Sequence, residues 1–333
     1  MSAQRVTVVG DGGWGTALAL LLCGKGHAVR LWGAFPDYVA EMGRRGENVT
    51  FLPGIPLPEE LELADDMAAA VAGAGLLVAA VPTQFMRRVL ERLAPCCPRG
   101  VPVVSVAKGI EERTLLRPTQ VVRDVLGRVP VLALSGPSHA EEVARGLPTT
   151  VALASRHAGR ARAVQEAFMS QRFRVYTNTD VVGVELGGAV KNVIAIAAGI
   201  CDGLGLGDNA KAALLTRGLA EMRRLGTALG ARRATFAGLA GVGDLITTAI
   251  SPYGRNRAVG VAIGEGHGLR DVLASMEQVA EGVRTTRSVR ALARRHGVEM
   301  PITEQCYRVL FGGKDPRRAV DDLMRRAAKD EEA

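Results

Sequence analysis

The chain has 333 residues, of which 47% are hydrophobic, 23% charged and 4% aromatic. This length predicts about two domains with a sizeable buried core, so the composition excludes a disordered chain, a collagen and a small disulfide scaffold. The formal net charge of +8 favours anionic ligands, but the charges are scattered and form no aromatic-interleaved basic block, so we expect no nucleic-acid partner.

The five cysteines form an odd set without a C-x-x-C spacing, which favours a reducing compartment and argues against a metal site. The chain enters an apolar run and a glycine loop almost at once, without the charged, apolar and cleavage regions of a secretory signal. The longest uninterrupted apolar run, 193–201, is shorter than the ~20 residues that cross a membrane. We therefore expect a cytoplasmic protein with no membrane span.

Short β-branched runs alternate with helix-like segments through the first half of the chain. Apolar strands separated by helices are typical of a parallel sheet that is covered on both faces. We predict helices at 16–23 and 159–170, and strands at 5–9, 28–32, 76–81, 101–107, 131–134, 150–154 and 173–176.

Strand signals stop near residue 180, and helical patterns punctuated by Gly or Pro fill the rest of the chain. The predicted helices cover 185–202, 209–229, 271–276, 285–296, 302–311 and 316–328. We therefore predict an α/β doubly wound sheet in residues 1–180 that binds a dinucleotide, followed by an all-α substrate and catalytic domain in residues 181–333.

The first loop reads G-D-G-G-W-G at 10–15, between a predicted strand and a predicted helix. In the G-x-G-x-x-G pattern the first glycine makes a tight turn, the second admits a pyrophosphate and the third allows close helix packing. The helix N-terminus then faces the negative charge. The pattern predicts a Rossmann-type dinucleotide site, and the alternative is an ordinary strand-to-helix turn.

The adenosine end of that site is ambiguous in the sequence. About 20 residues on, where an acidic side chain would bind the ribose hydroxyls, the chain has Gly33, Ala34 and Phe35. Phe35 would either stack on adenine or pack in the core. Arg30 and Arg44 are candidate cations for a 2′-phosphate, so the choice between NADH and NADPH stays open.

Two further loops follow predicted strands, at the edge where open α/β sheets bind ligands. Lys108 lies in one of them and is expected to face the crevice, with a solvated loop cation as the alternative. The other reads S-G-P-S-H-A at 135–140, whose small residues permit close approach of a ligand. We interpret His139 as a capping or packing residue rather than an acid–base group, because the sequence offers it no partner.

Lys191 lies inside the most apolar predicted helix. A buried lysine needs a counter-charge or a lowered pKa, and a lysine with a lowered pKa is a suitable proton donor for reducing a carbonyl. The alternative is a lysine whose ammonium group reaches the surface.

A glycine-rich segment, 238–243, leads to Asp244, whose carboxylate would orient and balance that lysine. Thr248 is four residues on and would share the helix face of Asp244. Arg255 then offers a planar fork for a phosphate, and Asn256 offers an amide.

Taken in order, these segments resemble the bacterial type of NAD(P)-dependent sn-glycerol-3-phosphate dehydrogenase. The likeness runs from residue 10 to about residue 285 and rests on G-D-G-G-W-G at 10–15, A-K-G-I-E at 107–111, S-G-P-S-H-A at 135–140, V-K-N-V at 190–193, G-V-G-D-L at 241–245, G-R-N at 254–256 and E-G at 281–282. The resemblance implies reversible hydride transfer between NAD(P)H and dihydroxyacetone phosphate, giving sn-glycerol 3-phosphate for glycerophospholipid synthesis. It also implies a homodimer.

The resemblance assigns roles to individual residues. Lys191 would be the general acid/base, with Asp244 and Lys108 as further catalytic groups. Substrate contacts would come from Lys108, Gly136, Ser138, Lys191, Asn192, Asp244, Thr248, Gly254, Arg255 and Asn256. The cofactor would contact Gly10, Gly12, Gly13, Trp14, Gly15, Lys108, Ala140, Arg255, Val279 and Glu281.

The chain departs from the family pattern at three positions. Gly13 and Gly254 stand where the family often has Ser, and a backbone N–H would have to replace the hydroxyl contact of residue 254 with the phosphate. Ala34 stands where a basic residue usually follows the second strand, which puts a preference for NADPH in doubt.

Three other functions are compatible with parts of the pattern. A related two-domain dehydrogenase acting on another phosphorylated sugar or a hydroxy acid would share the glycine loop and the helix-borne lysine, but it would not account for the G-R-N segment. A redox-sensing regulator would bind nucleotide without turnover. A nucleic-acid binder would show salt-sensitive retention of DNA.

Overall fold

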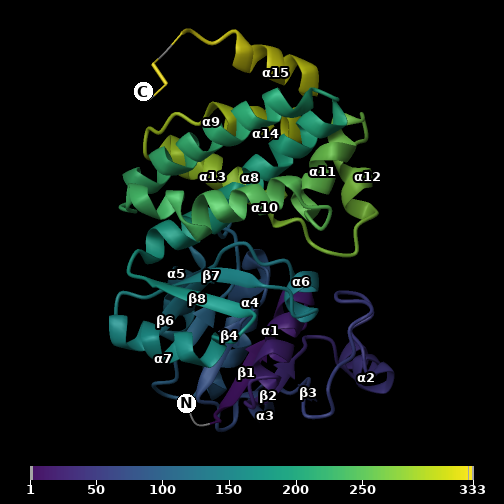
Figure 1. Ribbon diagram of the computed structural model, residues 1–333, viewed down its shortest axis with the longest axis vertical. Helices are drawn as coiled ribbons and strands as arrows, with labels where there is room; N and C mark the ends of the chain where they lie inside the picture. The colour runs from purple at the N-terminus through teal and green to yellow at the C-terminus, as the bar shows by residue number, and fades with distance from the viewer. Residues whose placement is uncertain (1–2, 329, 332–333) are drawn as a thin grey trace.

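Eight strands form one sheet in the first part of the chain, and helices cover both of its faces (Figure 1). The computed structural model describes residues 3–328 and 330–331. From residue 181 onward the described residues form helices and loops, stacked on one end of the sheet (Figure 1). This arrangement confirms the predicted fold class, a doubly wound α/β sheet followed by an all-α part.

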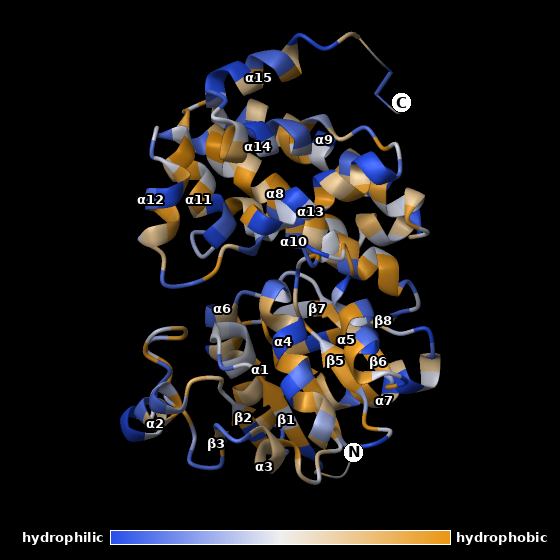
Figure 2. Cartoon of the chain, turned by 180° about the vertical axis from the view of Figure 1, so that it is seen from behind, coloured by the Kyte–Doolittle hydropathy of each residue, from blue (hydrophilic) through white to orange (hydrophobic). Residues whose placement is uncertain are grey.

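The strand order is β3-β2-β1-β4-β5-β6-β7-β8, so the sheet grows outward in both directions from the first strand. Figure 2 shows the strands as an orange, apolar layer between helices with polar outer faces. The strands are β1 (Arg5–Val9), β2 (Ala28–Trp32), β3 (Glu62–Ala64), β4 (Leu76–Ala79), β5 (Val103–Ser105), β6 (Val131–Ser135), β7 (Thr149–Ala154) and β8 (Phe173–Asn178).

One strand pair departs from the predicted parallel sheet. β7 runs antiparallel to β6, with Leu134 opposite Leu153, whereas β7 and β8 are parallel again. The connection 136–148 contains only a five-residue helix, α6 (Ala140–Ala144). This helix is too short to cross the face of the sheet and return to the starting edge, as parallel pairing requires.

The predicted helices are all present, with ends that differ by a few residues, but several helices of 9–11 residues and some shorter ones were not assigned a range in the prediction. The first part contains α1 (Gly13–Cys23), α2 (Pro36–Arg45), α3 (Met67–Val71), α4 (Thr83–Leu93), η1 (Ala94–Cys96), α5 (Pro118–Leu126), α6 and α7 (Ala158–Phe168). The second part contains α8 (Val181–Gly203), α9 (Gly207–Ala228), η2 (Arg233–Ala237), η3 (Leu239–Gly243), α10 (Asp244–Ile250), α11 (Arg255–Gly264), α12 (Leu269–Ala274), α13 (Glu281–Arg295), α14 (Pro301–Gly312) and α15 (Pro316–Met324).

Helix α8 is the core of the second part. It is longer than the apolar run seen in the sequence: its 23 residues and a mean hydropathy of 1.6 would suffice, by length and composition alone, to cross a membrane. However, 94% of its most apolar window is buried inside the molecule. Since α9, α10, α11 and α13 pack around it, this burial is that of a central helix in a helical bundle.

Glycines bring α8 and α11 into backbone contact. A Cβ at Gly199 would lie 2.1 Å from the carbonyl oxygen of Arg257, and a Cβ at Gly203 would lie 2.2 Å from that of Val261. On the facing helix, a Cβ at Gly260 would lie 2.1 Å from the carbonyl oxygen of Ile196. No larger residue fits at these positions unless the helices separate.

We expect Gly260→Ala to lower the free energy of unfolding by about 2 kcal/mol or more, because the added methyl group overpacks two backbones. Gly159→Ala is the matched control: Gly159 lies in α7, and a Cβ there meets nothing within 4 Å. That change should be neutral or stabilise the helix by about 0.5–1 kcal/mol. Thermal and urea unfolding measure both, and equal stability of the two variants would contradict the close-packing argument.

Candidate active site

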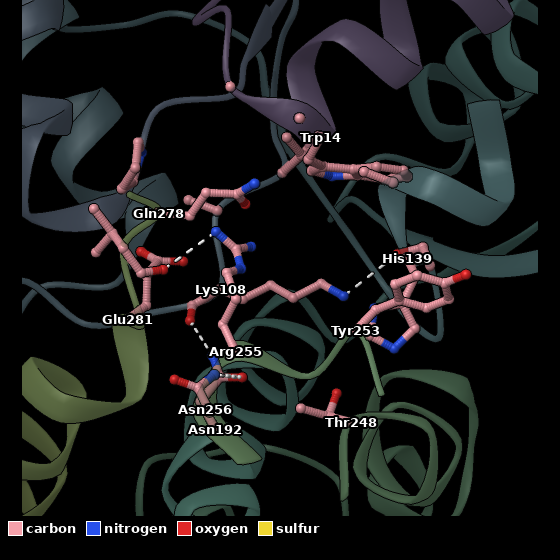
Figure 3. A pocket seen from close by; sticks show the side chains of 18 of the residues that line it. Trp14, Lys108, His139, Asn192, Thr248, Tyr253, Arg255, Asn256, Gln278 and Glu281 are labelled. Carbon is pink, nitrogen blue, oxygen red and sulfur yellow. Dashed lines mark hydrogen bonds between the residues drawn. The ribbon is translucent and has the colours of Figure 1, made fainter. Parts of the chain in front are cut away.

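A cavity of about 180 Å³ lies where the carboxyl ends of the strands meet the helical part (Figure 3). Residues from both parts of the chain line it. Those already singled out in the sequence are Gly12, Gly13, Trp14, Lys108, Ser138, His139, Ala140, Lys191, Asn192, Asp244, Thr248, Gly254, Arg255, Asn256, Val279 and Glu281.

A single buried carboxylate binds two lysines at the centre of this cavity. Lys191 Nζ lies 2.7 Å from Asp244 Oδ1, and Lys108 Nζ lies 2.9 Å from Asp244 Oδ2. Lys191 also donates to the hydroxyl of Thr248, one turn after Asp244 on α10. Both Lys191 and Asp244 are almost fully buried, so the paired lysine of the sequence prediction is present and its surface alternative is wrong.

The charges of this cluster shift one another's pKa values. Burial lowers the pKa of Lys191 to about 8, with Lys108 acting in the same direction, while Asp244 opposes the shift. Burial favours protonation of Asp244, but Lys108 and Lys191 outweigh it and hold its pKa below the ordinary value. Lys191 is therefore a buried amine whose pKa lies well below that of an ordinary lysine, beside a carboxylate whose ionised form is favoured.

The glycine-rich segment before Asp244 explains how that carboxylate reaches the centre. The turn η3 ends at Gly243 and leads directly into α10. A Cβ at Gly241 would lie 2.1 Å from the carbonyl oxygen of Phe236, and a Cβ at Gly187 on α8 would lie 2.2 Å from that of Ala240. These glycines thus allow η3 to pack directly on the backbone of α8, at a position one helical turn before Lys191.

Two asparagines connect the lysine loop to the helical part. Asn192 Nδ2 donates to the carbonyl oxygen of Lys108 at 2.7 Å, and Asn256 Nδ2 donates to Asn192 Oδ1 at 2.9 Å. Asn256 Oδ1 in turn accepts from the backbone N–H of Gly282 at 2.9 Å. These hydrogen bonds connect three helices and the Lys108 loop, and Figure 3 shows Asn192 and Asn256 side by side.

The glycine loop fits the pyrophosphate of a dinucleotide. Helix α1 begins at Gly13 with no capping side chain and no acidic residue in its first turn, so its N-terminal N–H groups face the cavity. A Cβ at Gly12 would meet nothing within 4 Å, which leaves open space for the ligand. Gly10 and Gly15 do not line the cavity; a Cβ at Gly15 would lie 1.9 Å from the carbonyl oxygen of Gly10, so these two glycines shape the turn from behind.

Gly136 contributes its backbone rather than a lining surface. Its carbonyl oxygen accepts from Lys108 Nζ at 2.8 Å, and its φ of +139° is one that favours glycine. Gly254 lines the cavity, but its N–H donates to the carbonyl oxygen of Ser251 at 3.1 Å. The N–H of Gly254 itself is therefore occupied, so it is not the backbone N–H that would replace the serine hydroxyl.

His139 occupies the N-cap position of α6 without making a capping hydrogen bond with its side chain. Its ring packs 5.8 Å from the ring of Tyr253 instead. Burial, with Lys191 and Lys108, lowers the pKa of His139 to about 4, so the imidazole is neutral near pH 7. The packing interpretation fits this geometry better than a capping or acid–base role.

Several residues that line the cavity were not among the predicted site residues; among them, Tyr253 and Gln278 have polar side chains. Gln278 belongs to the loop between α12 and α13, and its amide lies 3.5 Å from the carbonyl oxygens of Thr50 and Phe51. Glu281 makes a second crossing contact, accepting from the N–H of Thr83 at 2.7 Å. Tyr253 directly precedes the G-R-N motif, which was the signal available for it, whereas nothing near Gln278 marked it.

Two family models match the chain. One is described as the N-terminus of NAD-dependent glycerol-3-phosphate dehydrogenase and matches residues 5–161; the other is described as the C-terminus and matches residues 180–321.

Curated relatives and a solved structure agree with these matches. An NAD(P)+ glycerol-3-phosphate dehydrogenase from Geobacillus kaustophilus is 52% identical over 331 residues, covering 98% of this chain and 96% of that protein. One from Citrifermentans bemidjiense is 52% identical over 332 residues, 99% of each chain. The crystal structure of glycerol-3-phosphate dehydrogenase from Coxiella burnetii, 43% identical, has a TM-score of 0.94 and covers 97% of this chain and 99% of that chain.

The lysine titration can be measured directly, because the chain has only six lysines. With ε-¹³C-lysine labelling, we expect one NMR resonance, absent from Lys191→Met, to titrate at about 8. In Asp244→Asn this resonance should titrate at lower pH, because the wild-type carboxylate stabilises the charged form of the Lys191 amine and the variant lacks it. A Lys191 resonance in the ordinary lysine range of about 10.4 would contradict the burial argument.

Proposed function

The chain belongs to the NAD-dependent glycerol-3-phosphate dehydrogenase family, and on that premise we propose how its residues carry out the reaction. The enzyme transfers a hydride between NAD(P)H and dihydroxyacetone phosphate, with sn-glycerol 3-phosphate as the reduced product. The observation that carries the proposed mechanism is the buried lysine pair around Asp244, which lines the same cavity as the glycine loop.

In this mechanism Lys191 is the proton donor. The bound cofactor supplies the hydride to C2 of the substrate, and negative charge develops on the C2 oxygen. The Lys191 ammonium stabilises that charge and gives up its proton, leaving a neutral amine; in the oxidative direction the amine takes the proton back. A pKa of about 8 supports both directions near neutral pH.

Asp244 and Lys108 act around this proton transfer. Asp244 holds the Lys191 amine in place through the 2.7 Å contact. Lys108 adds positive potential, and its Nζ also contacts the carbonyl oxygen of Gly136 and the hydroxyl of Ser138 at the substrate end of the cavity. Thr248, on the same helix as Asp244, accepts a further hydrogen bond from the Lys191 amine.

We assign the substrate phosphate to the N-terminus of α11. The helix begins at Arg255, and Arg255 and Asn256 both line the cavity. The first-turn N–H groups of a helix and the planar guanidinium together suit a dianionic phosphate. Binding energy from that end would then orient C2 for hydride transfer at the other.

Other parts of the prediction also belong to this proposal. We propose a division of labour between residues 1–180, which would bind the cofactor, and residues 181–333, which would supply Lys191 and the phosphate contacts; β8 ends at Asn178 and α8 begins at Val181. We also propose that the enzyme acts as a cytoplasmic homodimer that supplies glycerophospholipid synthesis. Five cysteines that are all free support a reducing compartment.

Lys191→Ala should lower kcat by about 10²–10⁴-fold, because proton transfer and charge stabilisation are both lost, while nucleotide affinity is retained. Initial rates of NADH oxidation with dihydroxyacetone phosphate measure this loss, and titration with NADH measures binding. Lys211→Ala is the control, since Lys211 binds Asp202 outside the cavity and its loss should leave kcat unchanged. Near-normal turnover of Lys191→Ala would refute the assignment.

Arg255→Ala should raise KM for dihydroxyacetone phosphate by about tenfold or more, because a charge-assisted contact with the phosphate is removed. The rate with unphosphorylated dihydroxyacetone, which lacks that contact, should change little. An unchanged KM for the phosphorylated substrate, or an equal loss with both substrates, would contradict the phosphate assignment.

A further inference from the structure

The position that usually recognises the adenosine ribose has no side chain in this protein. In Rossmann-type folds an acidic residue just after the second strand binds the ribose 2′-hydroxyl, and an arginine nearby accommodates a 2′-phosphate. Here β2 ends at Trp32, and the next residue is Gly33. Neither kind of side chain is therefore available from residue 33 itself.

Asp11, from the glycine loop, occupies the space that a side chain at residue 33 would take. A Cβ built on Gly33 would lie 2.4 Å from Asp11 Oδ2 and 3.0 Å from its Cγ. The loop is fixed in this position by its backbone, because the carbonyl oxygen of Asp11 accepts from Asn48 Nδ2 at 2.7 Å and from the hydroxyl of Thr16 at 3.3 Å. The carboxylate thus stands at the end of β2 although it comes from the end of β1.

This carboxylate has no counter-ion among residues 3–328 and 330–331. Asp11 Oδ2 is buried and has no hydrogen-bond partner in the described part of the chain. Burial raises the pKa of Asp11, against an opposing effect of its own backbone N–H. A buried carboxylate oxygen without a donor is costly, and a ligand hydroxyl that donates to it would relieve that cost.

The nearby arginines named in the sequence are not placed to offset this charge. Arg30 is held by Glu62 at 2.7 Å and by the carbonyl oxygens of Ala69 and Ala72. Arg44 lies in the last turn of α2, about 12–15 Å along the helix from its start beside the cofactor loop.

The residues that follow Gly33 supply no cation either. Ala34 has no polar side chain, and Phe35 is 71% exposed. Phe35 is therefore not a core residue, which leaves its predicted stacking on adenine.

We propose that Asp11 recognises the adenosine ribose and repels a 2′-phosphate, so that the enzyme prefers NAD(H) to NADP(H). This inference rests on the proposed cofactor role of the glycine loop. The ribose 2′-hydroxyl donates to the carboxylate oxygen Oδ2, which otherwise has no donor in the described part of the chain, whereas a 2′-phosphate brings negative charge close to a buried negative charge. Repulsion between like charges at such short range is large enough for a tenfold or greater difference in affinity.

The test compares two ligands that differ only in the 2′-phosphate and cannot be turned over: ADP-ribose and 2′-phospho-ADP-ribose, titrated by calorimetry at fixed ionic strength. The wild type should bind ADP-ribose at least about tenfold more tightly. In Asp11→Asn this ratio should fall by about tenfold, chiefly through tighter binding of the phosphorylated ligand. A wild type that binds both ligands equally, or a ratio unchanged in Asp11→Asn, would overturn the proposal.

Asp37→Asn is the matched control, because Asp37 is an exposed carboxylate in the first turn of α2, where solvent screens its charge. The ratio should stay at the wild-type value, and a shift as large as that of Asp11→Asn would overturn the assignment to Asp11. If Asp11→Asn fails to fold, Asp11→Ser provides the comparison. A wild-type protein that does not bind ADP-ribose more tightly than 2′-phospho-ADP-ribose contradicts the proposal without any variant.

The same preparation is assayed with NADH and dihydroxyacetone phosphate, which separates this proposal from the proposed function. Selective ADP-ribose binding without turnover supports the role of Asp11 and contradicts the mechanism built on Lys191. Turnover without selective ADP-ribose binding supports the mechanism built on Lys191 and contradicts the role of Asp11. A protein that binds neither ligand contradicts both proposals.

Discussion

The organisation of the active site depends on one buried carboxylate that is shared by two ammonium groups. Asp244 comes from the helical part, Lys191 from its central helix and Lys108 from the edge of the sheet. Three charges away from water are expensive unless each is paired, so Asp244 makes the other two possible. Because the two lysines come from different parts of the chain, the same carboxylate connects the sheet part to the helical part. Two ammonium groups and one carboxylate leave one net positive charge in the cavity.

That arrangement requires the backbone of α8 to lie unusually close to neighbouring segments, which glycine residues permit because they have no side chain. Gly187 faces the turn that carries Asp244, and Gly188 faces Ser135 at the end of β6, where a Cβ would lie 2.5 Å from the serine hydroxyl. Lys191 follows on the same helix. The long side chain of the lysine therefore starts deep in the interior and ends at the cavity, which accounts for both its burial and its lowered pKa.

Much of this could be predicted from the sequence, where a residue's role follows from its neighbours in the chain. The first two strands were located without error. The glycine loop and Lys108 were placed by their positions after strands, Lys191 by its position within an apolar helix, and Asp244 by the glycine-rich segment before it. What depends on contacts distant in sequence could not be predicted. The three-residue strand β3 exists only because β2 pairs with it, and the antiparallel β7 reflects the length of a connection.

The same limit applies to side chains in the site. Gln278 reaches the sheet from a loop of the helical part, and Asp11 substitutes in space for a residue on another strand. Such contacts are set by how elements dock, and composition or periodicity carries little information about docking.

The backbone contact between α8 and α11 has a further consequence for the choice of substrate. Lys191 lies on α8 and Arg255 begins α11, so the two ends of the proposed substrate are held by helices that have no layer of side chains between them. Interleaved backbones cannot slide past each other as side-chain interfaces can. On the proposed assignment, these backbones set the distance between the amine and the guanidinium, and we expect the site to select its substrate by the number of atoms between carbonyl and phosphate.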